Sequence, residues 1–574
     1  MSDLRWKIRA VLTRVNRSKT AAQNRMLAKR AKPDVRLEKF DHYPEPRSIG
    51  SFEVGQELLQ GKFVFAGKKI EGSTKTIWSI AAPSDGFSNE MHGFNWLDDL
   101  SAVGSKDARL LAQDWVRGWI RYYGDGSGPG WTPALTGRRL LRICAHARFL
   151  FRGLEPDIKT DLLTAIAIQL NYLGKSWRHE VAGQPRLEAL TGLIFAGVSF
   201  SGRSRSLLQA NKAIGDECAS FIDESGSIAT RNPEELLEVF TLLTWVCRTL
   251  EDAEAIPDPR IIAAIEEIAP TMRCLRLGDG SLTRFHGGGR GHEGRLDQAL
   301  SDSRVRGVRA GELAMGYDRM TAGRVTILLD CASPPPLAVS RHGHASTLAF
   351  EMSSGRLPMV VNCGAGQLFG PDWERVCRAT GAHNTIGIGA ISSSILAEQD
   401  FISRTFGERL TEMPKHVNHS REQGLHGSLL VASHDGYVKD FGVIHQRRLT
   451  LSIDGREIQG VDAFFAHGKH QEAVSARAFT AHFHLHPDIK AALSKDGTKI
   501  IMQLPNMETW EFTQNGAKFS LEDSVYLDQR NLKPRATKQI VASGAIVEYA
   551  GQITWMFKRV QDAERPKIAP RLTP

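Results

Sequence analysis

The densest polar chemistry of the 574-residue chain lies in the segment RHGHASTLAFE, residues 341–351. Two further polar segments follow it, VVNCG at residues 360–364 and RATGAHNT at residues 378–385. His342 and His344 are two positions apart, so on a β-strand their imidazoles would lie on one face. With His383 arriving from a neighbouring segment, the three imidazoles predict either a zinc site or a group of hydrogen-bonded histidines inside a sheet.

The chain on both sides of this segment, after about residue 310, consists of short β-branched or alternating runs. Asp454-Gly455 and Asp496-Gly497 supply hairpin-turn chemistry between such runs. We therefore expect a large antiparallel β-sandwich in this half. The expected strands are 324–331, 347–352, 358–361, 384–388, 428–433, 447–453, 460–466, 480–486, 499–504 and 509–513.

Upstream, from about residue 94 to 300, apolar positions recur with the period of an α-helix. Asn232-Pro233-Glu234 is a helix start, with an N-cap, a proline at the first position and an acid near the positive end of the helix dipole. Antiparallel helices with short links predict hairpins that close into a bundle or ring. The expected helices are 107–122, 138–152, 158–173, 186–200, 206–223, 233–250 and 261–277.

The first 34 residues are basic throughout, and Leu4, Ile8, Val11 and Val15 recur at helical spacing. This pattern predicts a basic amphipathic helix. The longest apolar run in these residues is too short for the core of a signal peptide. Such a helix either contacts an anionic membrane surface or docks on the protein's own body, and docking is the preferred interpretation.

The composition excludes several classes of protein. The net charge of +9 favours polyanionic partners, but no nucleic-acid-binding module is recognisable. No apolar run approaches the roughly 20 residues that a membrane-spanning helix needs. The seven cysteines are odd in number, and no CxxC pair occurs among them, which argues against a disulfide framework and a cysteine zinc ribbon.

The HxHA, VNCG and AHNT elements occur in this order, and the chain resembles the heparinase II/III family of polysaccharide lyases, which is related to alginate lyases. The resemblance begins near residue 94 and is most specific between residues 316 and 385. It implies an α+β multidomain protein, with an N-terminal (α/α) toroid followed by a C-terminal antiparallel β-sandwich. The expected domains are a basic N-terminal segment (1–60), the toroid (61–305) and the sandwich (306–574).

The resemblance also implies a function. It predicts β-elimination of an acidic, uronate-containing polysaccharide such as a glycosaminoglycan, in the cleft between the two domains. Family members are often exported, which suggests the periplasm, whereas this N-terminus by itself suggests the cytoplasm. The alternative is a non-catalytic protein of the same fold that binds acidic glycans. A third possibility is a glycoside hydrolase, which needs two opposed carboxylates, and for which Asp98 and Asp99 are candidates.

Residue by residue, the resemblance makes His342 a catalytic candidate, because the first histidine of HxH faces the substrate cleft in the family. It makes His344 and His383 zinc ligands. The family's third ligand is an aspartate, and the matching position here is Asn362, whose neutral amide is a weaker zinc ligand.

The chain departs from the lyase pattern at two further places. The family's Asn-His pair in the toroid is matched by Gln184 and Pro185. Gln184 can still donate a hydrogen bond to a uronate carboxylate and is a catalytic candidate. The family's tyrosine has no counterpart between residues 362 and 383, so Tyr317 is the candidate acid or base among several possible sources. The predicted substrate-binding residues are His286, Arg378 and His434.

Overall fold

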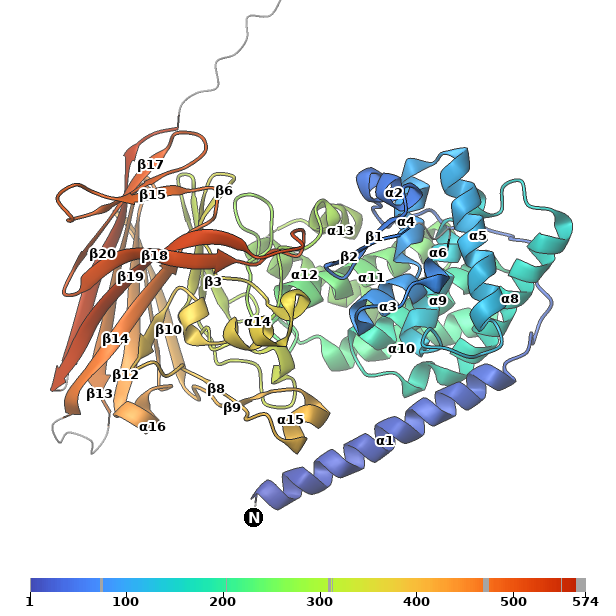
Figure 1. Cartoon of the computed structure of the whole chain (residues 1–574), viewed down its shortest axis with the longest axis horizontal. Helices are drawn as coiled ribbons and strands as arrows, with labels where there is room; N and C mark the ends of the chain where they lie inside the picture. Colours follow the sequence, from blue (N-terminus) through green and yellow to red (C-terminus); the bar gives the residue numbers. More distant parts are fainter. Residues whose placement is uncertain are drawn as a thin grey trace, which may run out of the picture. The chain divides into compact units, whose positions relative to one another are not determined.

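The computed structural model describes residues 2–72, 76–202, 204–307, 311, 313–467, 474–548 and 550–563. The chain divides into two compact units (Figure 1). Unit 1 comprises residues 1–228, 235–272 and 292–307, and unit 2 comprises residues 229–234, 273–291 and 308–574. The last change of unit lies between residues 307 and 308, and residues 1–60 group with the helices that follow them.

Unit 1 is helical, as its sequence period predicts (Figure 1). Local capping explains where helices begin: the Thr132 hydroxyl accepts a hydrogen bond from the Leu135 N–H, and Pro133 occupies the first position of its helix. The helix predicted at Pro233 begins there, and the Asn232 side chain accepts a hydrogen bond from the Glu234 N–H at 2.9 Å. The elements are α1 (Ser2–Arg30), α2 (Phe52–Leu59), β1 (Lys62–Phe65), β2 (Lys68–Glu71), η1 (Ile77–Ser79), α3 (Asp85–His92), α4 (Asn95–Val103), α5 (Lys106–Tyr123), α6 (Pro133–Ala145), α7 (Ala147–Leu150), α8 (Pro156–Ser176), η2 (Trp177–His179), α9 (Gln184–Ser199), α10 (Ser204–Phe221), α11 (Pro233–Asp252), α12 (Pro259–Cys274) and α13 (Arg295–Ser303).

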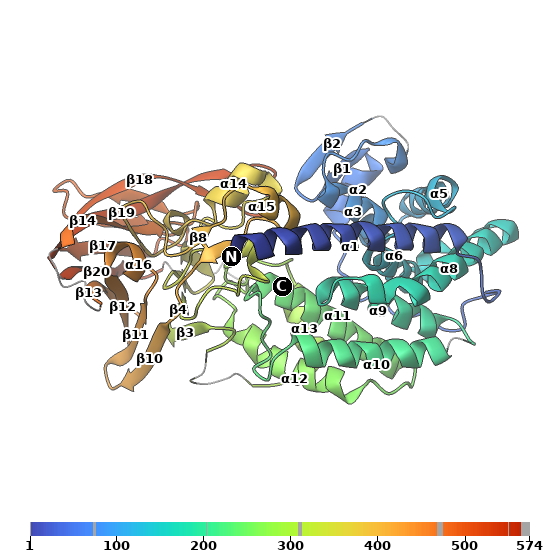
Figure 2. The ribbon, with the colours of Figure 1, turned by 90° about the horizontal axis from the view of Figure 1, so that it is seen from below.

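Helix α1 is one unbroken helix (Figure 2). Its C-terminal half docks on unit 1: the Asn24 side chain pairs with His179 at 2.8 Å, and Ala28 is buried. Val11, Leu12 and Val15 in its middle are each about half exposed. The prediction that this helix docks on the protein's own body holds for its C-terminal half. In the middle of the helix, the apolar side chains are exposed instead. No helix in the described part of the chain has both the length and the apolar character to cross a membrane.

Unit 2 consists mainly of antiparallel strands (Figure 1). Its largest sheet follows the order β10-β11-β12-β13-β20-β17-β16-β15, with β14, β18, β19 and β7 joined to it through β19 and β20, and a second sheet has the order β3-β4-β5-β6. The strands are β3 (Tyr317–Ala322), β4 (Val325–Asp330), β5 (Phe350–Ser354), β6 (Leu357–Val360), β7 (Ile386–Ile388), β8 (Ile395–Leu396), β9 (Leu410–Glu412), β10 (Val417–Gly424), β11 (Gly427–His434), β12 (Val443–Ser452), β13 (Glu457–Ala466), β14 (Val474–His484), β15 (Lys490–Leu493), β16 (Ile500–Gln503), β17 (Thr509–Asn515), β18 (Lys518–Tyr526), β19 (Arg535–Glu548) and β20 (Ala550–Gln561). The helical segments are η3 (Ser340–His342), η4 (Gln367–Phe369), α14 (Pro371–Val376), η5 (Thr380–Ala382), α15 (Phe401–Phe406) and α16 (Val438–Phe441).

One continuous apolar core holds these strands together. Phe350, Phe483 and Trp555 lie at its centre, with the rings of Phe350 and Trp555 stacked at 5.6 Å. Each such side chain contributes roughly 1.5–3 kcal/mol by leaving water. All seven cysteines are buried and free, which agrees with the absence of a disulfide pattern in the sequence.

The prediction that His342 and His344 share a strand face is wrong. His342 ends the short turn η3, and His344 follows it in a loop. Side chains two residues apart alternate to the same face only on a strand, so in this turn the two imidazoles lie in different surroundings. The His342 side chain is 42% exposed, whereas His344 is 3% exposed.

Candidate functional site

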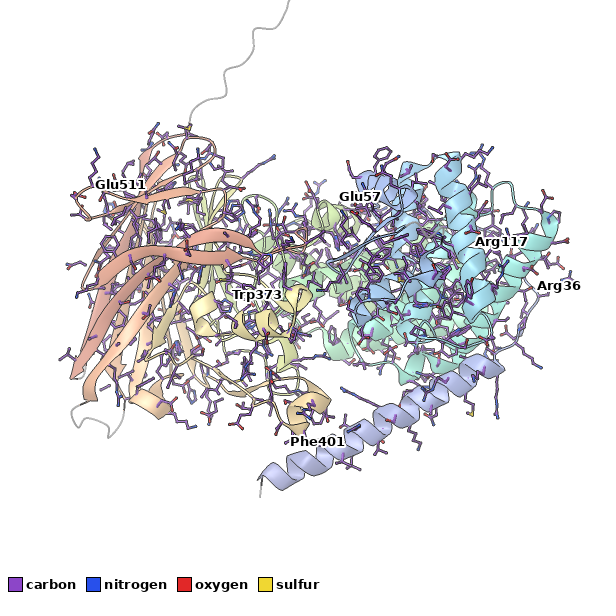
Figure 3. All side chains as sticks on the ribbon, viewed as in Figure 1. Arg36, Glu57, Arg117, Trp373, Phe401 and Glu511 are labelled. Carbon is purple, nitrogen blue, oxygen red and sulfur yellow. The ribbon has the colours of Figure 1, made fainter. Side chains whose placement is uncertain are left out.

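His342 is the only predicted site residue of unit 2 whose side chain reaches solvent in the described structure. Two polar groups hold its ring at Nδ1: the Gln367 amide nitrogen lies 2.8 Å away, and a Glu374 carboxylate oxygen lies 3.3 Å away. Gln367 belongs to η4, and Glu374 belongs to α14, which also carries Trp373 (Figure 3). The His342 ring pairs with Glu374 and holds the pKa of that carboxyl below its usual value. No hydrogen bond to Nε2 is found among the described residues, so this atom is available to a ligand.

Arg378 shapes this turn from inside. Its guanidinium donates to the carbonyls of Gly343 at 2.8 Å, Glu408 at 2.8 Å and Ser340 at 3.0 Å, and the residue is 2% exposed. Burial lowers its pKa to about 10. Because its N–H groups bind backbone carbonyls, Arg378 stabilises the turn that carries His342. The predicted substrate contact of Arg378 gains no support from this position.

His344 and His383 of the motif segments, together with His286 from the loop upstream, form a buried group that we call the motif cluster. The His344 N–H donates to His286 Nδ1 at 3.1 Å, and His344 Nδ1 lies 3.1 Å from His383 Nε2. Burial lowers the pKa of His383 to about 3 and the pKa values of His286 and His344 well below the ordinary value, so all three rings are neutral at pH 7. His286 Nε2 and His383 Nδ1 have no hydrogen-bond partner among the described residues.

Asn362 adjoins the motif cluster through Asn384, the neighbour of His383. Its side-chain oxygen accepts hydrogen bonds from the Asn384 N–H at 3.2 Å and from the Asn384 amide at 3.3 Å. Its own amide donates to the Arg284 carbonyl at 3.2 Å. The side chain is completely buried, and its oxygen is already used inside the core.

Tyr317 lies in the core of unit 2. Its hydroxyl donates to the Arg231 carbonyl at 2.7 Å, and the Arg231 guanidinium lies 4.7 Å above its ring. The residue is 1% exposed, and burial raises its pKa well above the ordinary value. A proton held this tightly is poorly suited to transfer, so the catalytic role predicted for Tyr317 gains no support here.

His434 belongs to a second buried group in unit 2, with His445, Arg447 and Asp462, which we call the Asp462 cluster. His434 Nε2 lies 3.2 Å from His445 Nδ1, and His445 Nε2 lies 2.8 Å from an Asp462 oxygen. Arg447 donates to both Asp462 oxygens, at 2.7 and 3.0 Å. His434 is 1% exposed, so in this position it supports the fold and gains no support as a substrate-binding residue.

Gln184, the remaining catalytic candidate, lies in unit 1, at the first position of α9. Its amide donates to a Glu188 oxygen at 3.0 Å, and Arg138 pairs with the same oxygen at 2.6 Å. These three residues line a pocket of about 160 Å³ within unit 1. The pocket is also lined by Arg142, Glu238, Trp245, His292 and Arg295. Guanidinium groups beside an indole ring suit a sugar that carries a carboxylate.

Asp98 and Asp99, the carboxylates considered for glycoside hydrolysis, lie in α4. Asp98 is buried and pairs with Arg142 at 2.8 Å and with His146 at 2.8 Å. Burial by itself would raise the pKa of Asp98, but Arg142 and His146 hold it below its usual value. Asp99 is in the opposite situation, since burial raises its pKa to about 7. Because both Asp98 oxygens are engaged by Arg142 and His146, Asp98 is not an open partner for hydrolysis.

Comparison with known proteins supports the resemblance that the order of the motifs indicated. A family model described as "Heparinase II/III-like, C-terminal" matches residues 308–556. Residues 308–556 therefore form the C-terminal domain of the heparinase II/III family. The structure of heparinase III matches with a TM-score of 0.67 and 12% identity, over 92% of this chain and 88% of that one. A heparan sulfate lyase HepC mutant from Pedobacter heparinus matches with a TM-score of 0.58 and 13% identity, over 97% and 90%.

These structural matches show the fold and confirm the predicted fold class: a helical toroid followed by an antiparallel β-sandwich. Among curated proteins, FtsZ-localized protein C of Caulobacter vibrioides (strain NA1000 / CB15N) is 27% identical over 538 residues, which cover 90% of this chain and 89% of that protein. The fold is therefore that of the family's polysaccharide lyases, while one similar protein is named for its localisation.

The residues present do not fit the family's metal site. Two of the three positions keep histidine, but their ring nitrogens face each other, and Asn362 brings no charge and has a committed oxygen. Within the described ranges, no group of three or more His, Cys, Asp and Glu side chains is placed to hold a metal ion. A divalent cation here would be buried with neutral ligands only. The buried Arg284 guanidinium nearby would also repel it. Zinc remains a prediction.

Sequence reasoning missed Gln367 and Glu374, which hold the His342 ring. The Gly370-Pro371 start of α14, with acids at positions 372 and 374, was a signal for this short helix. It also missed Arg138 and Glu188, the partners of Gln184. No local signal marks them, because α6 and α9 meet only in the folded unit.

Proposed function

We propose that this protein is a polysaccharide lyase that cleaves an acidic, uronate-containing glycan by β-elimination, with His342 as the base. One observation carries the proposal: the His342 side chain is 42% exposed, and its Nδ1 is held by Glu374 and Gln367. The other imidazoles of the motif segment are buried.

The tautomer of His342 decides whether it is a base. A carboxylate only accepts hydrogen bonds, so Glu374 favours the proton on Nδ1. The Gln367 amide nitrogen lies 2.8 Å from Nδ1 and can only donate, so this contact fits the Nδ1-protonated tautomer only after the amide flips and presents its oxygen. Nε2 then carries the lone pair and can take the proton next to a uronate carboxylate. As the C=C bond forms, the C–O bond to the leaving sugar breaks, and the leaving oxygen takes a proton from water. Glu374 is thus a positioning residue, which acts through the His342 ring.

β-Elimination needs the negative charge of the uronate to be neutralised, because otherwise the adjacent proton is hard to remove. In unit 1, Arg138, Arg142 and Arg295 line the pocket at Gln184, where each is paired with a carboxylate, and they support acidic-sugar binding there only if the sugar displaces such a partner. A uronate carboxylate entering this pocket would compete with Glu188 for Arg138. The net charge of +9 raises the rate at which a polyanion arrives.

The test is to incubate the protein with a panel of uronate polysaccharides and to follow ultraviolet absorbance of the unsaturated product. We expect turnover on at least one of them, and His342→Ala should lower its rate by about 10²–10⁴-fold. His416→Ala, at an exposed histidine of unit 2, is the matched control and should keep the wild-type rate. A folded wild-type sample without product on any substrate contradicts the proposal.

A second candidate function is glycan binding without cleavage. It is favoured by Pro185, which stands where the family has a histidine, and by Glu188, which occupies the Gln184 amide. The same panel separates the two functions: saturable binding with no rise in absorbance, unchanged in His342→Ala, identifies a binding protein.

Helix α1 supports a further proposal, peripheral contact with an anionic membrane. Residues 2–30 carry nine Lys and Arg against one Asp, and Val11, Leu12 and Val15 are exposed on this basic helix. We expect the protein to sediment with vesicles that contain anionic lipid but not with neutral vesicles. Leu12→Glu should abolish sedimentation, and the exposed but uncharged change Asn16→Gln should not. Equal binding to neutral vesicles would contradict an electrostatic contact.

Localisation with FtsZ is the last proposal, and it rests on the relative that carries this property in its name. Similarity over nine-tenths of both chains supports it. A fluorescent fusion of the full chain should follow labelled FtsZ in dividing cells, and a uniform distribution would contradict it.

A further inference from the structure

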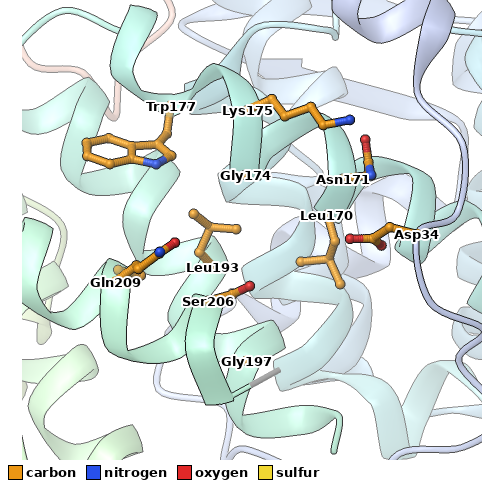
Figure 4. Close-up of a pocket in the computed structure, with 11 residues that line it drawn as sticks. Asp34, Leu170, Asn171, Gly174, Lys175, Trp177, Leu193, Gly197, Ser206 and Gln209 are labelled. Carbon is orange, nitrogen blue, oxygen red and sulfur yellow. The ribbon is translucent and has the colours of Figure 1, made fainter. Parts of the chain in front are cut away.

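A second pocket lies in unit 1, apart from the one at Gln184. Its volume is about 150 Å³, and it is bounded by α8, η2, α9 and α10 together with Asp34, from the segment after α1 (Figure 4). Its lining residues are not shared with the Gln184 pocket. Nothing in the proposed lyase chemistry uses it.

The lining of this pocket has two parts. Leu170 and Leu193 provide an apolar floor, and the indole of Trp177 stands at its edge (Figure 4). Amides and a hydroxyl line it as well, from Asn171, Gln209 and Ser206. A sugar ring has an apolar C–H face and a rim of hydroxyls, so it matches an aromatic ring combined with side-chain amides.

Trp177 has one cation–π contact before any ligand arrives, since the Arg178 guanidinium lies 4.2 Å above its ring. A contact that restrains the ring reduces the conformational freedom lost on binding. The charged lining residues are one acid, Asp34, and one base, Lys175, so the pocket has no charge excess that would select an anion.

Gly174 is the most informative residue of this pocket. It lies inside α8, where alanine is the better helix former. A Cβ atom at Gly174 would meet nothing within 4 Å, and its φ is not positive, so neither packing nor backbone geometry demands glycine. Gly197, the other pocket glycine, differs, because its Cβ would meet Leu207 at 3.1 Å. The missing side chain at Gly174 keeps space open.

From these observations we propose that the pocket at Trp177 is a second glycan-binding site, which holds one uncharged sugar ring through stacking and side-chain hydrogen bonds. The inference goes beyond the proposed lyase function and requires no catalysis.

The test uses the full chain with three probes, glucose, N-acetylglucosamine and glucuronate, with binding measured by saturation-transfer NMR and calorimetry. We expect millimolar binding of at least one uncharged sugar and weaker binding of glucuronate. Gly174→Leu, which fills the pocket with a good helix former, and Trp177→Ala should each weaken binding at least tenfold. Leu208→Ala, at an exposed leucine of α10 outside the lining, is the matched control.

Circular dichroism and the melting temperature confirm that each variant is folded. Absence of uncharged-sugar binding by the wild type overturns the proposal, as does binding that survives in both folded pocket variants or a preference for glucuronate. Because binding is the readout, a protein without turnover, which would contradict the lyase proposal, leaves this test intact.

Discussion

The two buried histidine clusters of unit 2 differ in whether they contain a charge. In the Asp462 cluster, the carboxylate accepts hydrogen bonds from Arg447, from Trp555 at 2.8 Å and from His445, and it is fully paired. In the motif cluster, all three imidazoles are neutral, and His383 Nδ1 and His286 Nε2 have no hydrogen-bond partner among the described residues. His286 Nε2 lies 3.6 Å from an oxygen of the buried Asp330. The Asp462 cluster, whose polar groups are all hydrogen-bonded, stabilises the fold. The motif cluster, which has two ring nitrogens without a hydrogen bond, lies in the region where the family's metal site was predicted.

The largest expected effect comes from opening the closed cluster. Asp462→Asn removes the charge that pairs with Arg447, which is completely buried. Leaving a buried charge without its partner costs about 3–5 kcal/mol. We expect the free energy of unfolding of unit 2 to fall by this amount in denaturant titrations.

The matched control is Asp523→Asn, at an exposed aspartate paired with Lys538. It should leave the unfolding curve almost unchanged. If both variants destabilise the protein equally, the Asp462 cluster is not the structural element described above.

A second experiment restores a charge to the motif region. Asn362→Asp gives this region the carboxylate that the family's metal site has. Zinc at a hundredfold excess over its dissociation constant should then stabilise the variant by about 2.7 kcal/mol, measured as a rise in melting temperature. The wild type is the control, and an equal rise in the wild type would mean that its two histidines and Asn362 already bind zinc.

The neutral state of the buried imidazoles predicts a pH dependence. His484 donates its backbone N–H to Asn384 beside the motif cluster, and burial lowers its pKa to about 3. Below pH 6.5 the unfolded chain binds a proton that the folded protein does not, so stability falls as the pH falls towards 3. The expected loss is about 1.4 kcal/mol per pH unit for this histidine.

This loss is measured as the difference in unfolding free energy between pH 7.5 and pH 5.5. His484→Gln should show a shallower pH dependence than the wild type. An unchanged slope in the variant would mean that His484 does not contribute.

The smallest effect on stability is expected at the exposed histidine. His342→Ala, at a side chain that is 42% exposed, should change the unfolding free energy by no more than about 0.5 kcal/mol. A large loss of turnover together with this small change would assign His342 to function. A loss of stability comparable to that of Asp462→Asn would assign it to the fold.

Much of the secondary structure follows from local sequence. The periodicity of apolar positions located the helices α5 and α8 to α12, and the Asn232-Pro233 signal located the start of α11. The single helix expected at 138–152 is divided into α6 and α7. The strands that sequence reasoning missed include β10, whose residues Val417–Gly424 are mostly exposed and polar. Such a strand has no local hydrophobic pattern and forms because β11 offers it hydrogen bonds along its whole length.

The candidate site was only partly predictable. The motif order led to the family, and it named His342, His344, His383 and Asn362 as one region. It did not separate them, because a turn such as η3 leaves no period in the sequence. The surroundings of Tyr317 and His434 were likewise invisible, since Arg231 and Asp462 are far from them along the chain.

By itself, then, the sequence determined the likeness to the heparinase II/III family, the order of a helical and a β-rich half, and the departures from the lyase pattern at residues 184–185 and 362. These properties depend on residue identity and short-range spacing. Only the tertiary structure decided that His342 is exposed while the other motif imidazoles are buried and neutral. Exposure and pKa are set by what packs around a side chain, and those neighbours come from distant parts of the chain.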